Sequence, residues 1–293
     1  MENPTQRLVA LLRTWVARRS SADARRWFEE QIAKLSSAPT EKDIYLALGY
    51  VTRRLGKYDL GLSPHDLVVA GEACPGWDPS DWSVDQASRI ALILASYDGD
   101  DARFHARIEQ LFRTADIGEL IAFYRGLPLY PAPNLHVSRA REGARSAMQP
   151  IFEAVVHRNP YPRIQFDENA WNHMVLKALF IGSKLDPIQG LDQRANAGLM
   201  RMLCDYAHER WAAGRPVSPE LWRCVGQFAD DAALTDLGRV LEAGGLAERQ
   251  AAAMALTAST SPRAKDLLAR APELARNAAA GRLGWAALSK TAQ

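Results

Sequence analysis

Helix-start signals followed by helical periodicity recur along this chain of 293 residues and constrain its fold more than any other feature. Each signal is a residue that can cap a helix, followed by proline or by an acidic or amide residue in the first turn; the capping residues are Thr40, Ser63, Ser83, Ser218 and Ser261. Their side chains can accept hydrogen bonds from the free backbone amides of a first turn. No segment alternates in polarity over the length of a strand between hairpin turns, so the sequence predicts an all-α fold.

The spacing of these signals indicates paired helices. Starts near residues 40, 63, 83 and 101 are about 20 residues apart, which is half of a two-helix HEAT-type repeat. Near the C-terminus an alanine-rich helix follows Gly244-Gly245, and its small side chains would let neighbouring helices approach from both sides. We therefore expect stacked antiparallel helix pairs, a HEAT-like α-solenoid, with the pattern clearest over 217–285. An alanine-rich helical bundle would show the same pattern.

We expect residues 1–293 to form a single elongated helical domain. Glycine and several prolines interrupt the helical pattern between about 126 and 137, which favours an extended connector there. A second irregular stretch covers 157–166. Because the helices on both sides are alike in character, the segment near 126–137 is interpreted as a soft internal break.

Composition and charge exclude several partners. Lysine and arginine number 36 against 34 acidic residues, so the chain has no broad basic field for nucleic acid. No apolar run approaches the roughly 18 residues of a membrane span, and the N-terminus lacks the pattern of a secretory signal. Three widely spaced cysteines provide neither a disulfide framework nor a metal knuckle. A cytoplasmic location is predicted.

Motifs of catalysis and cofactor binding are missing from the sequence. It contains no GxSxG element and no glycine-rich phosphate loop. His157, His173 and His208 are too far apart to define a metal site, although a site assembled in space is a minor alternative. We expect no cofactor and no metal.

The most informative segment runs from His157 to Gly182. Pro160 and Pro162 are expected to hold Tyr161 in extended backbone, and Asp167 is expected to cap the next helix. The candidate ligand-binding residues of this stretch are Asn159, Tyr161, Asp167, Trp171, Asn172 and Lys177. In one interpretation Asn172 and Lys177 hold an anionic or hydroxylated ligand. In the other, the same groups satisfy backbone atoms of a well-capped helix, and a buried Asn172 amide needs several hydrogen-bond partners.

Two further segments carry candidate residues. Asn196 is expected to cap a helix, while Asp192 and Arg194 either pair with each other or leave Arg194 to bind a carboxylate or phosphate. If this loop meets the loop at 157–167, both would line one ligand site. The segment WDPSDW, residues 77–82, supplies aromatic walls to the same concavity, or Trp82 simply packs beside the cap at Ser83.

Several long motifs resemble the EboA-domain family. They are PGWDPSDWSVDQASRIALIL, NPYP, FDENAWNHMVLKALFIG, GLDQRAN and DYAHERWAAGR, and the likeness runs from about residue 40 to 215. The resemblance implies a bacterial protein encoded beside prenyltransferase-like, sugar-phosphate-cyclase-like and TIM-barrel proteins. It also implies an association with traffic of secondary metabolites toward the periplasm, but it supplies no reaction.

Together these observations favour a non-catalytic helical-repeat protein that binds a small metabolite or a partner enzyme in secondary-metabolite biosynthesis or traffic. The alternative is an enzyme of unknown class that acts on a cyclic, prenylated or sugar-like intermediate. Its active groups would be Asp167, His173, Lys177 and Arg194. A third hypothesis is pure scaffolding, and the sequence does not indicate an oligomeric state.

Overall fold

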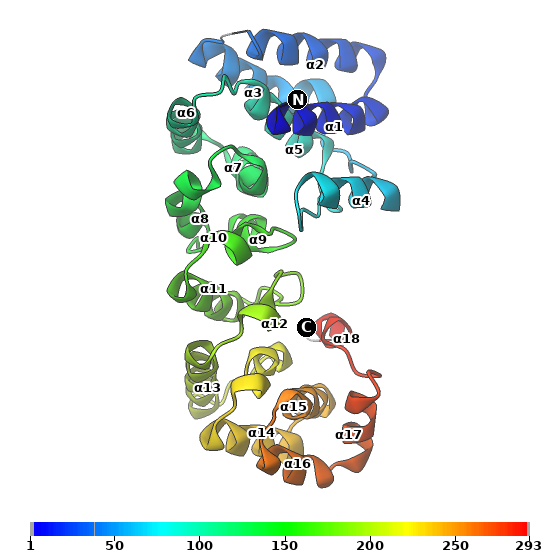
Figure 1. Cartoon of the computed structure of the whole chain (residues 1–293), viewed down its shortest axis with the longest axis vertical. Helices are drawn as coiled ribbons and strands as arrows, with labels where there is room; N and C mark the ends of the chain where they lie inside the picture. Colours follow the sequence, from blue (N-terminus) through cyan, green and yellow to red (C-terminus); the bar gives the residue numbers. More distant parts are fainter. Residues whose placement is uncertain (1–2, 38, 292–293) are drawn as a thin grey trace. The chain divides into compact units, whose positions relative to one another are not determined.

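The computed structural model describes residues 3–37 and 39–291, and within these ranges the chain forms helices and no strand (Figure 1). Extended backbone pairs at one isolated antiparallel bridge in the described residues, between Asp59 and Ser83. The prediction of an all-α fold is therefore confirmed. None of the described helices is both long and apolar enough to cross a bilayer.

The chain divides into two compact units, unit 1 (Met1–Phe166) and unit 2 (Asp167–Gln293). Each has a buried core of its own. The predicted soft break at 126–137 lies inside unit 1. That the whole chain forms one elongated domain stays a prediction.

Unit 1 contains α-helices joined by short connections and two 3-10 helices, η1 and η2. In chain order the helices are α1 (Pro4–Arg19), α2 (Ala22–Leu35), α3 (Glu41–Leu55), α4 (Pro64–Ala73), α5 (Val84–Ala95), α6 (Asp101–Thr114), α7 (Ile117–Gly126), η1 (Leu127–Leu129), η2 (Pro133–His136), α8 (Val137–Gly143), α9 (Gln149–Val156) and α10 (Tyr161–Gln165).

Capping boxes confirm the predicted helix starts at Thr40 and Ser63. The Thr40 hydroxyl accepts a hydrogen bond from the Asp43 amide at 3.3 Å, and the Asp43 carboxylate accepts the Thr40 amide at 3.0 Å. Ser63 and Asp66 form the same reciprocal pair at the start of α4. Each such cap contributes about 1 kcal/mol to helix stability.

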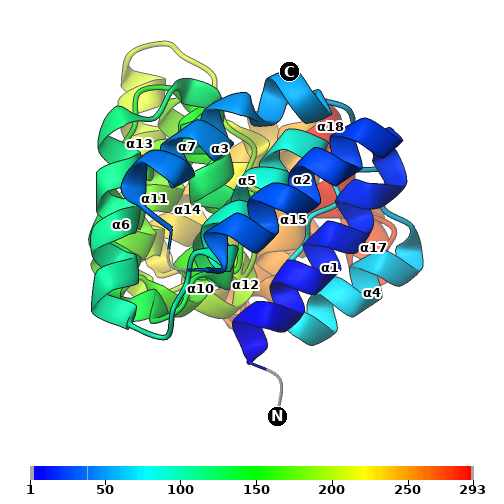
Figure 2. The same ribbon diagram turned by 90° about the horizontal axis from the view of Figure 1, so that it is seen from above.

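The core of unit 1 surrounds α5. Every residue of this helix except Gln86 is buried, and α1, α2, α3 and α7 pack against it. Figure 2 looks onto α1, α2 and α3, which cover α5. Beside them Trp77 packs between Trp15 and Trp82 in a tilted arrangement, with its ring centroid 5.5 Å from that of each neighbour. Trp82 therefore belongs to the core, as the packing interpretation of WDPSDW expected.

Proline-rich segments in unit 1 are helical where extended backbone was expected. Residues 127–129 and 133–136 form η1 and η2, and Tyr161 is the first residue of α10. Pro128, Pro133 and Pro162 all lie in the first turn of these helices, where the missing amide donor costs nothing. The predictions of an extended connector and of an extended Tyr161 are therefore wrong.

Unit 2 contains a second set of helices and two 3-10 helices, η3 and η4. They are α11 (Glu168–Phe180), α12 (Leu191–Arg194), α13 (Ala197–Ala212), η3 (Pro219–Cys224), η4 (Gly226–Phe228), α14 (Asp231–Ala243), α15 (Leu246–Ala258), α16 (Pro262–Ala269), α17 (Pro272–Ala279) and α18 (Trp285–Thr291).

The alanine-rich segment forms α15, the central helix of unit 2. α14, α16, α17 and both 3-10 helices pack against it. Its buried residues are mostly small: Ala251, Ala252, Ala253, Ala255 and Leu256. Small side chains let the neighbouring backbones come close, and a Cβ atom built on Gly226 would lie only 1.9 Å from the Ala255 carbonyl oxygen. The predicted close approach on several sides of this helix is confirmed.

Candidate functional site

The predicted site residues are divided between the two units. Unit 1 holds Asn159 and Tyr161, and unit 2 holds the remainder, namely Asp167, Trp171, Asn172, Lys177, Asp192 and Arg194. Each unit therefore carries a group of candidate residues with its own local geometry.

Asn159 is buried and joins three segments of unit 1. Its amide nitrogen donates to the carbonyl oxygens of Tyr124, at 3.1 Å, and Ala154, at 3.2 Å. Its side-chain oxygen accepts the backbone amide of Tyr161 at 3.0 Å. Both N–H groups and the oxygen of the carboxamide are thus used in fixing α7 and α9 to the start of α10.

Tyr161 is 1% exposed, and its hydroxyl donates to the carbonyl oxygen of Pro133. Burial raises the pKa of this phenol above its usual value, so the hydroxyl stays protonated and acts as a donor. The geometry gives Asn159 and Tyr161 a structural role in the NPYP segment. Their contact with a ligand stays a prediction.

Arg158, next to Asn159, joins two of the motif-bearing segments in unit 1. Its backbone is left-handed, with φ of 50°. Its guanidinium lies 3.5 Å from the Asp78 carboxylate and 4.0 Å from that of Asp81. Sequence reasoning missed this contact because residues 80 positions apart share no pattern of spacing. The acidic pair in WDPSDW was the one available signal.

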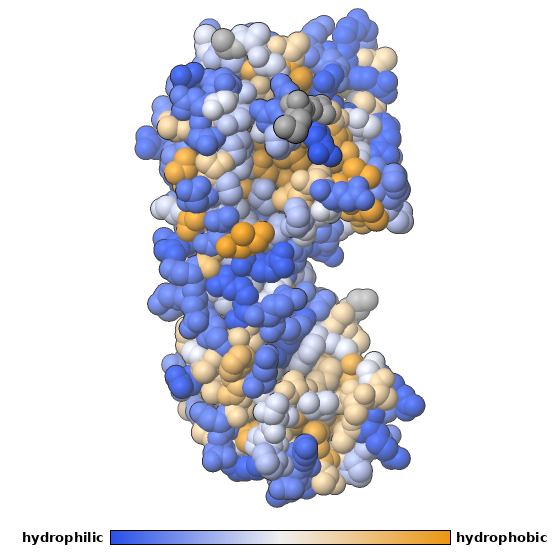
Figure 3. Space-filling model, in the orientation of Figure 1, coloured by the Kyte–Doolittle hydropathy of each residue, from blue (hydrophilic) through white to orange (hydrophobic). Residues whose placement is uncertain are grey.

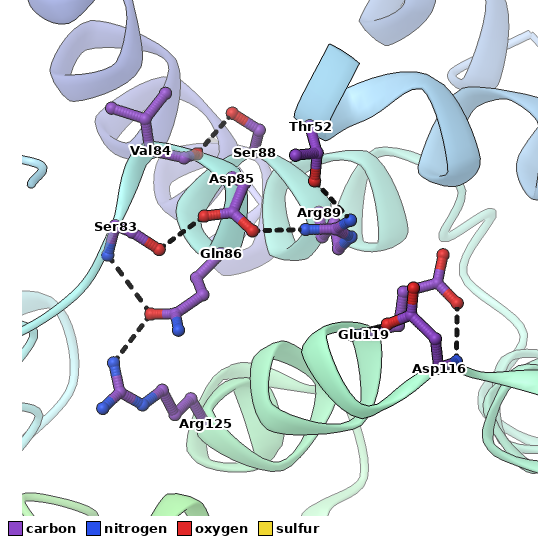
Figure 4. A network of polar contacts seen from close by, with 10 residues as sticks. All are labelled: Thr52, Ser83, Val84, Asp85, Gln86, Ser88, Arg89, Asp116, Glu119 and Arg125. Atoms are coloured by element: carbon purple, nitrogen blue, oxygen red, sulfur yellow. Dashed lines mark hydrogen bonds and ion pairs between the residues drawn. The ribbon is translucent and has the colours of Figure 1, made fainter. Parts of the chain in front are cut away.

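Arg125 of α7 connects the same acidic segment to α5. It donates to the Asp81 carboxylate at 2.8 Å. It also donates to Gln86 Oε1 at 2.7 Å (Figure 4). Burial lowers the pKa of Arg125, while the Asp81 carboxylate opposes this shift. Asp81 thereby lies close to two arginines, Arg125 and Arg158.

A buried ion pair joins the first two turns of α5. Asp85 accepts from Arg89 at 2.6 Å, and both side chains are almost completely buried (Figure 4). Arg89 also donates to the Thr52 hydroxyl of α3 at 2.9 Å. A buried pair must regain its desolvation cost through such contacts, so this pair fixes α3 against α5 and is structural.

In unit 2 the first turn of α11 meets α12 at Trp171 and Arg194. The Arg194 guanidinium carbon lies 4.6 Å from the centroid of the fully buried Trp171 ring. Burial lowers the pKa of Arg194, against the opposing charges of Asp167 and Glu168. The stack is a cation–π contact, and it brings the FDENAW and GLDQR motifs together.

Asn172, on the neighbouring position of α11, pairs with Asn196. The two carboxamides face each other, with their polar atoms 3.1 Å and 2.9 Å apart. Asn196 Oδ1 also accepts the Leu199 amide at 2.8 Å, which confirms it as the cap of α13. Gly198 lies against this pair, where an added Cβ would be 3.3 Å from Asn172 Nδ2. The buried Asn172 thus has the partners that the sequence required.

Asp192 pairs with Arg223 of η3, not with Arg194. Arg223 Nε donates to Asp192 Oδ1 and Nη2 to Oδ2, each at 2.8 Å, a bidentate arrangement that lowers the pKa of Asp192. The predicted pair with Arg194 is therefore wrong. Residues two positions apart on a helix do not share a face, so Asp192 and Arg194 point to different neighbours.

Asp167 and Lys177 lie at opposite ends of α11. The Asp167 carboxylate accepts the Ala170 amide at 2.8 Å, so its capping role is confirmed. The Lys177 ammonium lies 5.6 Å from the ring centroid of Phe180, which is 70% exposed. Trp171 and Lys177 are six residues apart, or about 9 Å along the helix axis. Lys177 is thus at a distance from the Trp171–Arg194 stack.

No group of three His, Cys, Asp or Glu side chains that could hold a metal ion is found within residues 3–37 and 39–291.

A family model described as metabolite traffic protein EboA matches residues 8–226 of the chain. The match covers the residues of the candidate site, from Thr52 to Arg223. No curated protein and no solved structure matches.

Proposed function

The chain belongs to the EboA family, and from that premise we propose that it is a non-catalytic helical protein that binds a small metabolite, or a pathway enzyme that handles one, in secondary-metabolite traffic. The family description supports the setting. The location and the chemistry of binding are argued from unit 2.

The observation that carries the proposal is the stack of Arg194 on Trp171. It unites two motifs of the family at one place, and the adjacent Asn172–Asn196 pair fixes both helices. A guanidinium that lies over an indole ring keeps its planar set of N–H donors, and such a set can bind both oxygens of a carboxylate or phosphate group. We therefore expect an acidic or phosphorylated metabolite, or an acidic side chain of a partner enzyme, at this position.

The proposal extends to the arrangement of the helices and to location. Stacked helix pairs of HEAT type would give an extended surface on which successive turns contact a partner. Small-angle scattering of the purified protein should then give the profile of an elongated particle, and a globular profile would contradict the stacking.

A cytoplasmic location is proposed because the three cysteines are free thiols.

Retention of a ligand tests the binding proposal. The protein is co-expressed with the pathway enzymes encoded beside it, purified gently and measured by native mass spectrometry. We expect the wild type to carry a metabolite or an enzyme of the pathway, and Arg194→Gln to lose it.

Arg201→Gln is the matched control, because Arg201 is an exposed arginine of α13 in the same unit. It should retain the ligand. Wild-type protein that retains neither metabolite nor pathway enzyme would refute the proposed function, and equal retention by Arg194→Gln would refute the assigned position.

The enzymatic alternative has less support in the geometry. Its four groups have different surroundings: Asp167 caps α11, Lys177 lies by Phe180, and His173 is exposed, with Nδ1 2.9 Å from the Asn169 carbonyl oxygen of its own helix. The fourth group, Arg194, lies over the Trp171 ring, and the charges of Asp167 and Glu168 oppose the lowering of its pKa by burial. The surroundings of these four groups therefore support binding better than catalysis.

A further inference from the structure

Helix α4 in unit 1 is apolar in sequence but poorly covered. Of its ten residues only Asp66 and Ala70 are buried, and Val68 is 58% exposed. A helix with apolar residues around its circumference is normally enclosed by other elements. Exposed apolar surface of this kind marks a binding site more often than ordinary surface does.

Polar contacts attach α4 to α1 at one end. The Asp66 carboxylate, in the first turn of α4, accepts from Trp15 Nε1 at 3.0 Å and from Arg18 Nη2 at 2.8 Å. Trp15 and Arg18 belong to the last turns of α1. The two helices are therefore antiparallel, and the first half of α1 lies beside the end of α4.

Beyond this attachment the two helices border an open depression of about 310 Å³ on the surface, here called the α1–α4 groove. The wall from α1 consists of Arg7, Ala10, Leu11 and Thr14, which share one face of the helix. The wall from α4 consists of Val69, Glu72 and Ala73. Figure 3 shows apolar surface between these helices. The volume is at the lower end of the range for small-molecule sites.

Two charged side chains lie in the walls of the groove. Arg7 and Glu72 are exposed, and neither has an ion-pair partner among residues 3–37 and 39–291. By contrast, Arg13 and Arg18 of the same helix both form ion pairs. The apolar lining beside Arg7 complements an apolar molecule that carries a single acidic group. The Glu72 carboxylate disfavours a second acidic group on that molecule.

We propose that the α1–α4 groove binds the apolar body of a small molecule that carries one acidic group, which Arg7 holds. This site is formed by residues of unit 1, whereas the Trp171–Arg194 contact belongs to unit 2, and the proposal does not rest on the function proposed for that contact. Either can therefore fail without the other.

Two fluorescent probes with the same skeleton test the proposal. 1-Anilinonaphthalene-8-sulfonate carries one acidic group, and N-phenyl-1-naphthylamine lacks it. Titration of the full chain should show saturable binding of both probes. Ala10→Phe adds a ring from the exposed centre of the α1 wall into the groove, and we expect it to weaken both affinities at least tenfold. Ala106→Phe, at an exposed alanine of α6, is the matched control and should leave both unchanged.

The charge variants test the role of Arg7. Because each exposed charge contributes modestly, Arg7→Gln should weaken sulfonate binding about threefold, and Glu72→Gln should strengthen it by a similar factor. The uncharged probe should respond to neither variant. Arg113→Gln, an exposed arginine of α6, is the control for general loss of positive charge.

Three outcomes would overturn the proposal. If the Ala10→Phe variant binds both probes as tightly as the wild type does, the groove is not their binding site. Equal effects of Arg7→Gln and Arg113→Gln on sulfonate binding would remove the role of Arg7. Light scattering that shows a wild-type dimer and a monomeric Ala10→Phe variant would assign the groove to a second copy of the chain. Circular dichroism establishes that each variant is folded.

Discussion

At the scale of single residues, the reciprocal amide bonds between Asn172 and Asn196 hold the motif region of unit 2 together. Asn172→Ala would leave the buried part of the Asn196 amide without its partner. We expect the free energy of unfolding to fall by about 1–2 kcal/mol, measured by urea denaturation. Asn169→Ala, at an exposed position of the same helix, is the control and should change it by less than about 0.5 kcal/mol. Equal losses in the two variants would show that the amide pair contributes nothing.

Asp66 makes the stability of unit 1 depend on pH, with lower stability in acid. Hydrogen bonds from Arg18, and then from Ser63, hold the pKa of Asp66 well below its usual range, despite the opposing effect of burial. A carboxyl whose folded-state pKa is lowered stabilises the fold fully above its unfolded pKa of about 3.9 and loses that contribution as the pH falls toward the folded value. Stability should therefore decline below about pH 4.

Asp66→Asn removes this titration. Its free energy of unfolding should be lower than that of the wild type at pH 7, and the difference should shrink as the pH falls from about 4 to 3. Urea denaturation over that range measures both. A difference that is the same at pH 7 and pH 3 would show that the carboxylate charge plays no part.

Residue roles were predictable from sequence where the partner lies within a few positions. The caps at Thr40, Asp167 and Asn196 follow from a side chain and an amide in the same turn. The pair of Asp192 with Arg223 was not predictable. It joins residues 31 positions apart, and only the packing of η3 against α12 brings them together.

At the scale of helices, η4 approaches α15 so closely at Gly226 that a side chain has no room there. A Cβ at Gly226 would meet the backbone of Ala255, which cannot rotate away as a side chain could. Gly226→Ala should therefore lower the free energy of unfolding of unit 2 by about 1–3 kcal/mol.

Gly49→Ala provides the matched comparison for Gly226→Ala. Gly49 lies within α3, and nothing lies within 4 Å of its added Cβ. Alanine should stabilise this helix by up to about 1 kcal/mol relative to glycine. Thermal denaturation of both variants should give shifts of opposite sign, and a neutral Gly226→Ala would mean that η4 moves without cost.

Helices were predicted well and proline-rich turns poorly. Periodicity and capping residues indicate a helix because both are local. Proline at 128, 133 and 162 was interpreted as favouring extended backbone, yet each lies in the first turn of a helix. Proline is compatible with both conformations, and the residues that follow it decide between them.

At the scale of the whole chain, composition and periodicity gave the all-α class, because each helix signal is independent of the others. The sequence did not predict which of those helices pack into the same unit. The chain divides at Phe166 and Asp167, where the sequence shows a helix cap like many others and no linker composition. Which helices share a core depends on long-range packing, which no local pattern encodes.

The two buried cores lead to a prediction about how the chain unfolds. Phe28 lies in the core of unit 1 and is fully buried, and Gly226 lies in that of unit 2. Because each core is formed from residues of its own unit, Phe28→Ala should speed amide hydrogen exchange within 1–166, and Gly226→Ala within 167–293. Core truncation of phenylalanine costs about 3–5 kcal/mol, enough for the change to be measured by mass spectrometry. Gly49→Ala is the control that should speed exchange in neither unit. If either destabilising variant speeds exchange equally across both ranges, the chain unfolds as one cooperative domain, as the sequence alone suggested.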